Sequence, residues 1–219
     1  MQLQKLANAV YRLTYFNLWA KGPAPALALS HSGLKHELVY PKDWSKEKGK
    51  ATFSKLPMLQ VEGGPTISHE LAILNFIGRV VPKMAGENTH DYLVSQQLMC
   101  ESEDIYAKLT RFQPTTSKKE KVTKEELDAF WSKPPNMMVH NREQGLHGNL
   151  RLLDDFYETT SSGTSIGECK LYSTLHLLRM IDGSVLETYD KLGVFYDKFS
   201  ALEKTRAIVD GRFAKYFMK

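Results

Sequence analysis

A proline placed directly before a short apolar run constrains this fold more than any other feature of the sequence. Leu56-Pro57 precedes residues 58–61, whose composition predicts a strand. Proline cannot donate to a β-ladder, so it stands at the start of a strand, where its peptide bond can be cis and the backbone before it is free for an outside partner. A helix then begins near Ser68, and helix N-termini bind anions. Together these features predict a binding site for a small acidic peptide.

Composition bounds the class of protein. The chain has 219 residues, 42% hydrophobic and 25% charged, enough for one large domain or two small ones. Its net charge of +4 gives no indication of nucleic-acid binding. No apolar run reaches the length of a membrane span, and the first residues carry no hydrophobic signal core, so we expect a cytoplasmic protein without membrane association. The seven histidines show no metal-ligand spacing, and Cys100 and Cys169 have apolar surroundings that favour small buried residues over reactive thiols.

The residues before Pro82 alternate between strand and helix patterns. Strands are expected at residues 10–16, 37–40, 58–61 and 66–67. A short helix at 24–32 is opened by prolines and closed by Gly33, and a second helix with apolar residues at helical spacing ends at Val81. This order predicts an α/β domain with a small mixed sheet.

The chain after Pro82 has almost entirely helical patterns. Helices are expected at residues 91–109, 124–131, 146–158, 165–181, 184–199 and 201–208. Ser165 and Glu168 fit a capping box, and the apolar residues that follow suit a buried central helix.

Several short motifs, taken in order, resemble those of glutathione transferases. They are Leu13-Thr14-Tyr15-Phe16-Asn17, Gly33, Trp44, Leu56-Pro57 and Leu71-Ala72-Ile73. Each motif alone is weak, but their order and spacing cover nearly the whole chain and look most similar to the sigma class, which includes the prostaglandin D synthases. The resemblance implies a thioredoxin-like glutathione-binding domain at residues 9–81, a linker at 82–89 and an all-α domain at 90–219.

The resemblance also implies a role for Tyr15, at the end of the first strand. In such enzymes a tyrosine at this position donates a hydrogen bond to the glutathione sulfur. A free thiol has a pKa of about 8.5 and is mostly protonated at neutral pH, so a preorganised donor favours the reactive thiolate. The alternative is that Tyr15 is only a core aromatic residue.

The remaining glutathione contacts follow from the same resemblance. The backbone of Leu56, ahead of Pro57, would pair with the cysteinyl part of glutathione. Lys55 and the indole N–H of Trp44 would hold its glycine carboxylate. Alternatively, Lys55 is a surface lysine and Trp44 a half-buried anchor under the loop.

The sequence departs from the family where the γ-glutamyl carboxylate binds. The family usually carries Gln or Glu followed by Ser at the start of this helix, and these positions hold His69 and Glu70 here. Two carboxylates about 4 Å apart repel each other by roughly 4 kcal/mol at an effective dielectric constant of about 20. Either Glu70 turns toward the ammonium group of the ligand, or it is protonated, or Ser68 and His69 bind the carboxylate. Glu70 can also be only a favourable first-turn acid.

A second departure follows Asn17, where sigma-class chains carry two arginines and this chain has Trp19 and Lys21. Trp19, Met99 and Tyr106 are the candidates for an apolar second-substrate pocket, although Met99 and Tyr106 also suit a core role. Glu101 and Asp104 lie about where acidic residues of the family often contact the ligand of the partner subunit. The alternative is that either is only a solvated surface acid.

Two functions from different classes follow. The first is a homodimeric, cytoplasmic glutathione transferase that conjugates or isomerises small hydrophobic electrophiles in detoxification, with glutathione as co-substrate and no metal. The second is a non-catalytic protein that keeps this fold for binding or structure, with an altered ligand site. Tyr15, Trp44, Lys55 and Leu56-Pro57 favour the enzyme, whereas His69-Glu70 and the missing arginines favour the alternative. A glutaredoxin-like oxidoreductase is excluded, because no cysteine stands near the N-terminus of the first helix. We expect the enzyme.

Overall fold

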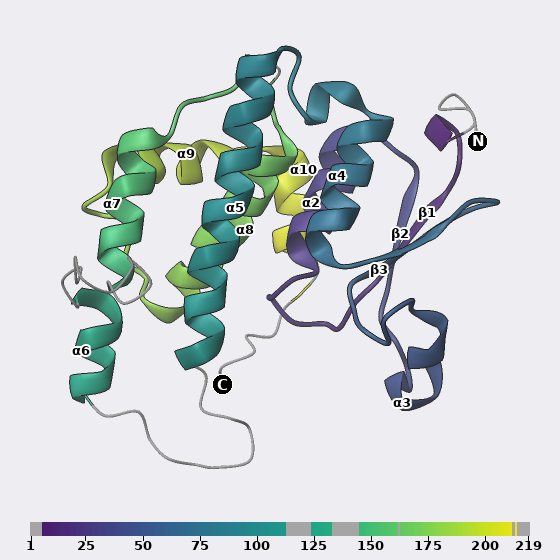
Figure 1. Cartoon of the computed structure of the whole chain (residues 1–219), viewed down its shortest axis with the longest axis horizontal. Helices are drawn as coiled ribbons and strands as arrows, with labels where there is room; N and C mark the ends of the chain where they lie inside the picture. The colour runs from purple at the N-terminus through teal and green to yellow at the C-terminus, as the bar shows by residue number, and fades with distance from the viewer. Residues whose placement is uncertain (1–5, 113–123, 133–144, 162, 212, 214–219) are drawn as a thin grey trace.

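The computed structural model describes residues 6–112, 124–132, 145–161, 163–211 and 213. Figure 1 shows a sheet-containing part formed by the first third of the chain, packed beside a helical part formed by the rest. One cluster of buried apolar side chains runs through both parts. The two parts therefore share a core.

The sheet-containing part is built on four short strands. They are β1 (Tyr11–Thr14), β2 (His36–Val39), β3 (Met58–Val61) and β4 (Thr66–Ser68), in the spatial order β2-β1-β3-β4. β1 runs parallel to β2 and antiparallel to β3, and β3 pairs antiparallel with β4. β3 begins directly after Pro57, because proline cannot donate to the ladder, and the Leu56-Pro57 bond is cis.

Two helices lie between the sheet and the helical part (Figure 1). α2 (Pro23–Ser32) has proline at its first position and ends at Gly33, whose φ of 78° is in the left-handed region that favours glycine. α4 (Glu70–Val80) buries an apolar face against the core. The smaller elements are α3 (Trp44–Glu47) and the 3-10 helices η1 (Lys48–Lys50) and η2 (Pro82–Met84).

The described residues of the helical part form α5 (Thr89–Phe112), α6 (Lys124–Ser132), α7 (Leu146–Phe156), α8 (Ile166–Ile181), α9 (Asp190–Ala201) and α10 (Glu203–Val209). α8 is buried and packs against both α5 and α2. Its predicted capping box is present: the Ser165 hydroxyl accepts from the Glu168 N–H at 3.1 Å, and the Glu168 carboxylate accepts from the Ser165 N–H at 2.8 Å. Gly167 permits the close approach of α5, since a Cβ there would lie 2.2 Å from the Ser95 carbonyl oxygen.

These elements confirm the predicted fold class, a thioredoxin-like α/β domain followed by an all-α domain, with three corrections. The helix expected from residue 184 begins at Asp190. The Asp182 carboxylate accepts hydrogen bonds from the Ser184 N–H and hydroxyl, at 2.9 and 2.7 Å, which favours a turn over a helix there. The loop around Trp44 contains α3. Cys100 is exposed, whereas Cys169 is buried as expected.

Candidate functional site

One edge of the sheet brings together most of the residues predicted to bind glutathione. The strand register aligns four residues in one row, namely Val39, Thr14, Met58 and Ser68. Tyr15, Pro57 and His69 are each the next residue beyond this row, so they emerge at the same edge, where α4 also begins. Segments distant in the sequence therefore meet at one place.

Tyr15 is held at this edge with its hydroxyl group protonated. The side chain is 7% exposed, and its hydroxyl oxygen accepts a hydrogen bond from the Lys21 N–H at 3.0 Å. No described residue accepts a hydrogen bond from its O–H group. Burial raises the pKa of Tyr15 to about 12, although the Lys21 N–H acts in the opposite direction. At neutral pH the hydroxyl therefore keeps a proton that it can donate.

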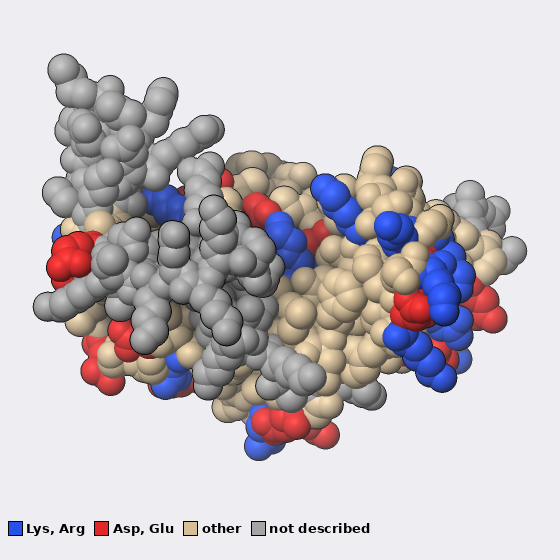
Figure 2. Space-filling view, turned by 90° about the horizontal axis from the view of Figure 1, so that it is seen from below, with Lys and Arg blue, Asp and Glu red and all other residues tan. Residues whose placement is uncertain are grey.

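The loop before β3 presents free backbone groups and a cation. Among the described residues, neither the N–H nor the C=O of Leu56 has a hydrogen-bond partner. Lys55 is exposed and forms no ion pair in the described part of the chain. Trp44 is half-buried, with its ring edge-on to Phe16 at 6.1 Å between centroids. Figure 2 shows lysine and arginine side chains gathered at this end of the molecule, where the exposed lysines are Lys42, Lys46, Lys48, Lys50 and Lys55.

The start of α4 offers unpaired polar groups. Ser68 is 5% exposed, and its hydroxyl has no hydrogen-bond partner among the described residues. His69 has a φ of 75°, which is unusual for a residue with a side chain, and it does not cap the helix. The N–H groups of the first turn of α4 are therefore without a capping side chain. Backbone strain of this kind collects at ligand sites, and unpaired helix N–H groups suit an anion.

The Glu70 carboxylate belongs to a network of four charges between the two parts of the molecule. Glu70 is 2% exposed and accepts a hydrogen bond from the Lys170 ammonium of α8 at 2.8 Å, while the Lys21 ammonium lies 4.0 Å away. Glu103 of α5 pairs with both lysines, with Lys170 at 2.9 Å. The ring of Tyr106 lies 4.7 Å from the Lys21 Nζ and 5.0 Å from the Lys170 Nζ.

This network shows what compensates the unexpected acid at position 70. Lys170, 100 residues further along the chain, supplies the opposite charge. Burial raises the pKa of Glu70, and the lysines offset only part of that effect. Burial acts in the same direction on Glu103, but the two lysines outweigh it and lower the pKa of that carboxyl group. Two acids and two lysines sum to zero, so the network adds no net charge beside the anion site.

The three residues expected to line an apolar substrate pocket are all buried: Trp19 is 1% exposed, Met99 2% and Tyr106 7%. The Trp19 indole N–H donates to the Ser173 carbonyl at 2.8 Å, and its ring lies 4.2 Å from that of His176. Trp19 thereby anchors the loop after β1 to α8. Tyr106 supports the two ammonium groups through cation–π contacts.

Three residues near the site escaped the sequence reasoning: Glu103, Lys170 and Phe213. A lysine inside an apolar helix that is expected to be buried requires an acidic partner, and this signal points to Lys170. The Phe213 ring packs 6.4 Å from Tyr15 and 6.3 Å from Trp19, measured between centroids, and Phe213 is 2% exposed. No local pattern in the sequence indicates that contact.

Two findings concern other kinds of site. In the described part of the chain, no group of three or more His, Cys, Asp or Glu side chains is placed to hold a metal ion. None of the helices in the described ranges has both the length and the apolarity that a membrane crossing requires.

Sequence comparison finds relatives over part of the chain. Over 71 residues, 32% of its length, it is 34% identical to glutathione S-transferase 1 of Ascaris suum, covering 34% of that protein. Over 71 residues it is 35% identical to hematopoietic prostaglandin D synthase of Gallus gallus, covering 35% of that protein. The chain thus spans about a third of the length of the curated relatives it matches. No family model matches the chain.

Structural comparison extends the likeness to nearly the whole chain. A Nu-class glutathione transferase from Haemonchus contortus superposes with a TM-score of 0.74, covering 93% of this chain and 97% of that one, at 15% sequence identity. Likeness at this identity defines the fold, which is the glutathione transferase fold. The resemblance inferred from the motifs is confirmed at this level.

Proposed function

We propose that this protein is a glutathione transferase that conjugates or isomerises small hydrophobic electrophiles. The observation that carries the proposal is the set of unpaired polar groups at one sheet edge. The free backbone of Leu56, the buried hydroxyl of Ser68 and the uncapped start of α4 lie beside the protonated hydroxyl of Tyr15. The names of the two sequence relatives, a glutathione S-transferase and a prostaglandin D synthase, support the same chemistry.

Each part of glutathione has a matching group at this edge. The Leu56 N–H and C=O would pair with the cysteinyl backbone, and Lys55 and Trp44 would hold the glycine carboxylate. The Ser68 hydroxyl and the first N–H groups of α4, reached past His69, would bind the γ-glutamyl carboxylate. Glu70 does not oppose that carboxylate, because Lys170 neutralises it in the interface.

Tyr15 would act on the sulfur. Its hydroxyl accepts from Lys21 and has a proton to donate, so it can hydrogen-bond to a thiolate and favour the charged form. The thiol proton leaves to solvent. In a conjugation, a sulfur lone pair forms the new S–C bond, and the leaving group departs with the electrons of the bond that breaks.

The remaining expectations belong to the same proposal. Residues 9–81 would form the glutathione-binding domain and residues 90–219 the all-α domain, joined by 82–89. The protein would be a cytoplasmic homodimer of the sigma class that acts in detoxification. Light scattering tests the oligomeric state, since two chains of 24.9 kDa give 2 × 24.9 = 49.8 kDa.

The second candidate is a non-catalytic protein that keeps this fold for binding or structure, with an altered ligand site. The observation that favours it is the filling of the space beside Tyr15 by Phe213, together with the burial of Trp19, Met99 and Tyr106. Such a protein would not transfer the thiol of glutathione to an electrophile, whether or not it binds glutathione.

One experiment separates the two candidates. Glutathione binding is measured by calorimetry, and conjugation of an activated chloronitrobenzene by absorbance, for the wild type, Tyr15→Phe and Tyr92→Phe. For the enzyme we expect micromolar to low-millimolar binding in all three proteins and a rate at least tenfold lower in Tyr15→Phe alone, because a lost donor to a charged group is worth about 1.5–3 kcal/mol. Tyr92→Phe is the control, because it removes the same hydroxyl group from a residue of α5 that is 46% exposed. Binding without a rate supports the second candidate. Absence of glutathione binding overturns the proposed transferase and leaves a protein whose altered site holds another ligand or none.

A further inference from the structure

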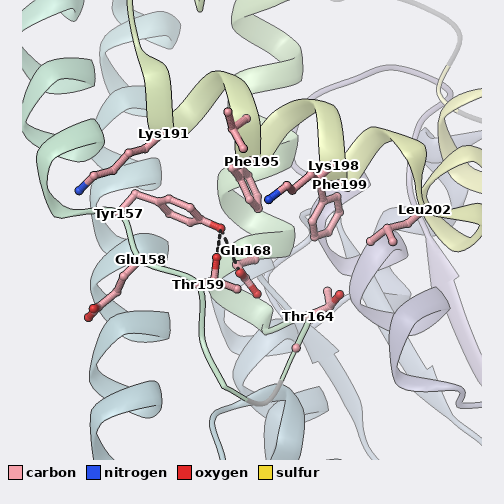
Figure 3. Close-up of a pocket in the computed structure, with 12 residues that line it drawn as sticks. Tyr157, Glu158, Thr159, Thr164, Glu168, Lys191, Phe195, Lys198, Phe199 and Leu202 are labelled. Carbon is pink, nitrogen blue, oxygen red and sulfur yellow. Dashed lines mark hydrogen bonds between the residues drawn. The ribbon is translucent and has the colours of Figure 1, made fainter.

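A cavity of about 420 Å³ lies in the helical part, between the segment that precedes α8 and the helix α9. Figure 3 shows Tyr157 and Thr159 on one side and Phe195, Lys198 and Phe199 on the other. None of the residues predicted to bind glutathione lines it. Its size is within the range of small-molecule sites, and its position gives it no part in the proposed function.

The walls of the cavity are mainly aromatic and aliphatic. Phe195 and Phe199 stand one helical turn apart, with ring centroids 5.4 Å apart, and Tyr157 lies 4.9 Å from Phe195. Val194 and Leu202 at the same cavity are 53% and 40% exposed. Large exposed apolar side chains around a hollow indicate an apolar ligand.

Two polar groups that line the cavity, the Tyr157 hydroxyl and the Glu168 carboxylate, already have partners. The Tyr157 hydroxyl donates to the Glu168 carboxylate at 3.3 Å. The same carboxylate also accepts from the Ser165 N–H at 2.8 Å. Glu158 at the edge pairs with His90 at 2.8 Å. These groups therefore require no polar group from a ligand, and the buried acid at position 168 would repel an anion placed deep inside.

The edge of the cavity carries a cation without a counter-charge. Lys198 is exposed on α9 between the two phenylalanines, and it makes no hydrogen bond or ion pair among the described residues. Lys191, the second lysine of the cavity, donates to the Asp155 carbonyl at 2.8 Å. A charged group of the ligand would thus be negative and would stay near the opening.

We propose that this cavity binds an amphiphilic carboxylate with a medium-length alkyl chain. The chain lies against Phe195 and Phe199, and the carboxylate pairs with Lys198 at the opening. The acid at position 168 sets the orientation, because it excludes the carboxylate from the interior.

Decanoate is the probe that tests this site, by calorimetric titration of the full chain. We expect Lys198→Glu to weaken decanoate binding at least tenfold, because attraction becomes repulsion, and to leave binding of uncharged decanol unchanged. Val194→Asp, at an exposed position of the opening, should weaken both. Octanoate should bind the wild type about tenfold more weakly than decanoate, since it buries two fewer methylene groups.

Lys83→Glu is the matched control, because it makes the same charge change on the exposed surface of η2. If Lys198→Glu and Lys83→Glu weaken decanoate binding equally, the effect comes from net charge alone, and the proposed site is wrong. Absence of decanoate binding by the wild type at millimolar concentration would overturn it as well.

Discussion

His176 shows how a single residue can make folding depend on pH. Burial lowers the pKa of His176 from 6.5 to about 4, with a smaller contribution from Arg179. The folded state therefore holds this ring neutral, next to the Tyr196 hydroxyl at 2.7 Å. A depressed histidine pKa favours the unfolded state once the solution pH falls below 6.5, because the unfolded chain then binds the proton more readily.

We therefore expect the free energy of unfolding to fall between pH 6.5 and pH 4, and His176→Gln to remove part of that fall. The full shift is reduced by partial exposure of the ring, so the difference between the two proteins should be on the order of 2 kcal/mol at pH 4. Urea unfolding at pH 7 and pH 4 measures it. Burial lowers the pKa of His31 to about 4 as well. The free energy of unfolding of the variant should therefore still fall with pH, but less steeply than that of the wild type. An equal loss of free energy of unfolding between pH 7 and pH 4 in the two proteins would contradict this account.

For single residues, position could be predicted from the sequence where it depends on the backbone conformation of neighbouring residues. Pro57 was predicted to lead the strand at residues 58–61, and β3 begins directly after it. Tyr15 was expected inside a strand at residues 10–16, with its role implied by the resemblance alone, and it follows β1, which ends at Thr14. Trp19 was assigned to a pocket wall, but its indole bonds to Ser173 on a helix 154 residues away. A sequence pattern carries no information on such a contact, because tertiary packing alone decides it.

At the scale of elements, Lys170 connects α8 to α4 and α5 by two ion pairs. The pair with Glu70 is almost fully buried, whereas Glu103 is 27% exposed. We expect Lys170→Met to lower the free energy of unfolding by about 3–5 kcal/mol, because it leaves buried acids without their partner. Adding Glu70→Gln should recover part of this loss. Lys21→Met is the control, with an expected cost of about 1 kcal/mol or less, since Lys21 is 34% exposed. Chemical denaturation measures all four proteins, and equal losses for the two lysines would contradict the network.

The end of α2 depends on the conformation of one glycine. Gly33 has a φ of 78°, and a Cβ there would meet no atom within 4 Å, so only the backbone conformation opposes a side chain. Gly33→Ala should therefore cost about 1–2 kcal/mol. Gly49→Ala also meets no atom within 4 Å but lies outside the left-handed region. It should change stability by less than about 0.5 kcal/mol. Thermal unfolding compares the two, and similar values would contradict the expected strain.

Element boundaries were predictable where periodicity and turn chemistry agree. β3 occupies the predicted residues 58–61, because proline fixes one end and Glu62-Gly63 begins a turn at the other. The start of α9 was placed too early, since Val185, Leu186 and Tyr189 are buried at nearly helical spacing within a run of turns. The spacing of these buried residues thus resembles that of a helix, although the hydrogen bond from the Ser184 N–H to the Asp182 carboxylate favours a turn.

At the scale of the whole molecule, the two parts should unfold together. Their apolar side chains form one cluster, α2 packs against α8 and α10, and the charge network crosses the same interface. We expect one calorimetric transition with equal van't Hoff and calorimetric enthalpies per cooperative unit. Two resolved transitions would show that the parts are energetically independent.

The division of the chain into an α/β part and a helical part was predictable because the hydrophobic period changes near Pro82. The contact between the parts was not, since it depends on Lys170, Trp19 and Phe213, each of which meets partners far away in the sequence. Sequence patterns describe which faces are apolar, and only the assembled structure shows which faces meet.

Gly22 has a consequence for how this protein tolerates mutation. Its backbone is in an ordinary helical conformation, but a Cβ there would lie 2.2 Å from the Tyr15 ring. Any replacement must displace that ring, and with it the hydroxyl at the sheet edge. In a library of variants selected for activity, position 22 would tolerate as little variation as Tyr15, although glycine offers no side chain to a ligand.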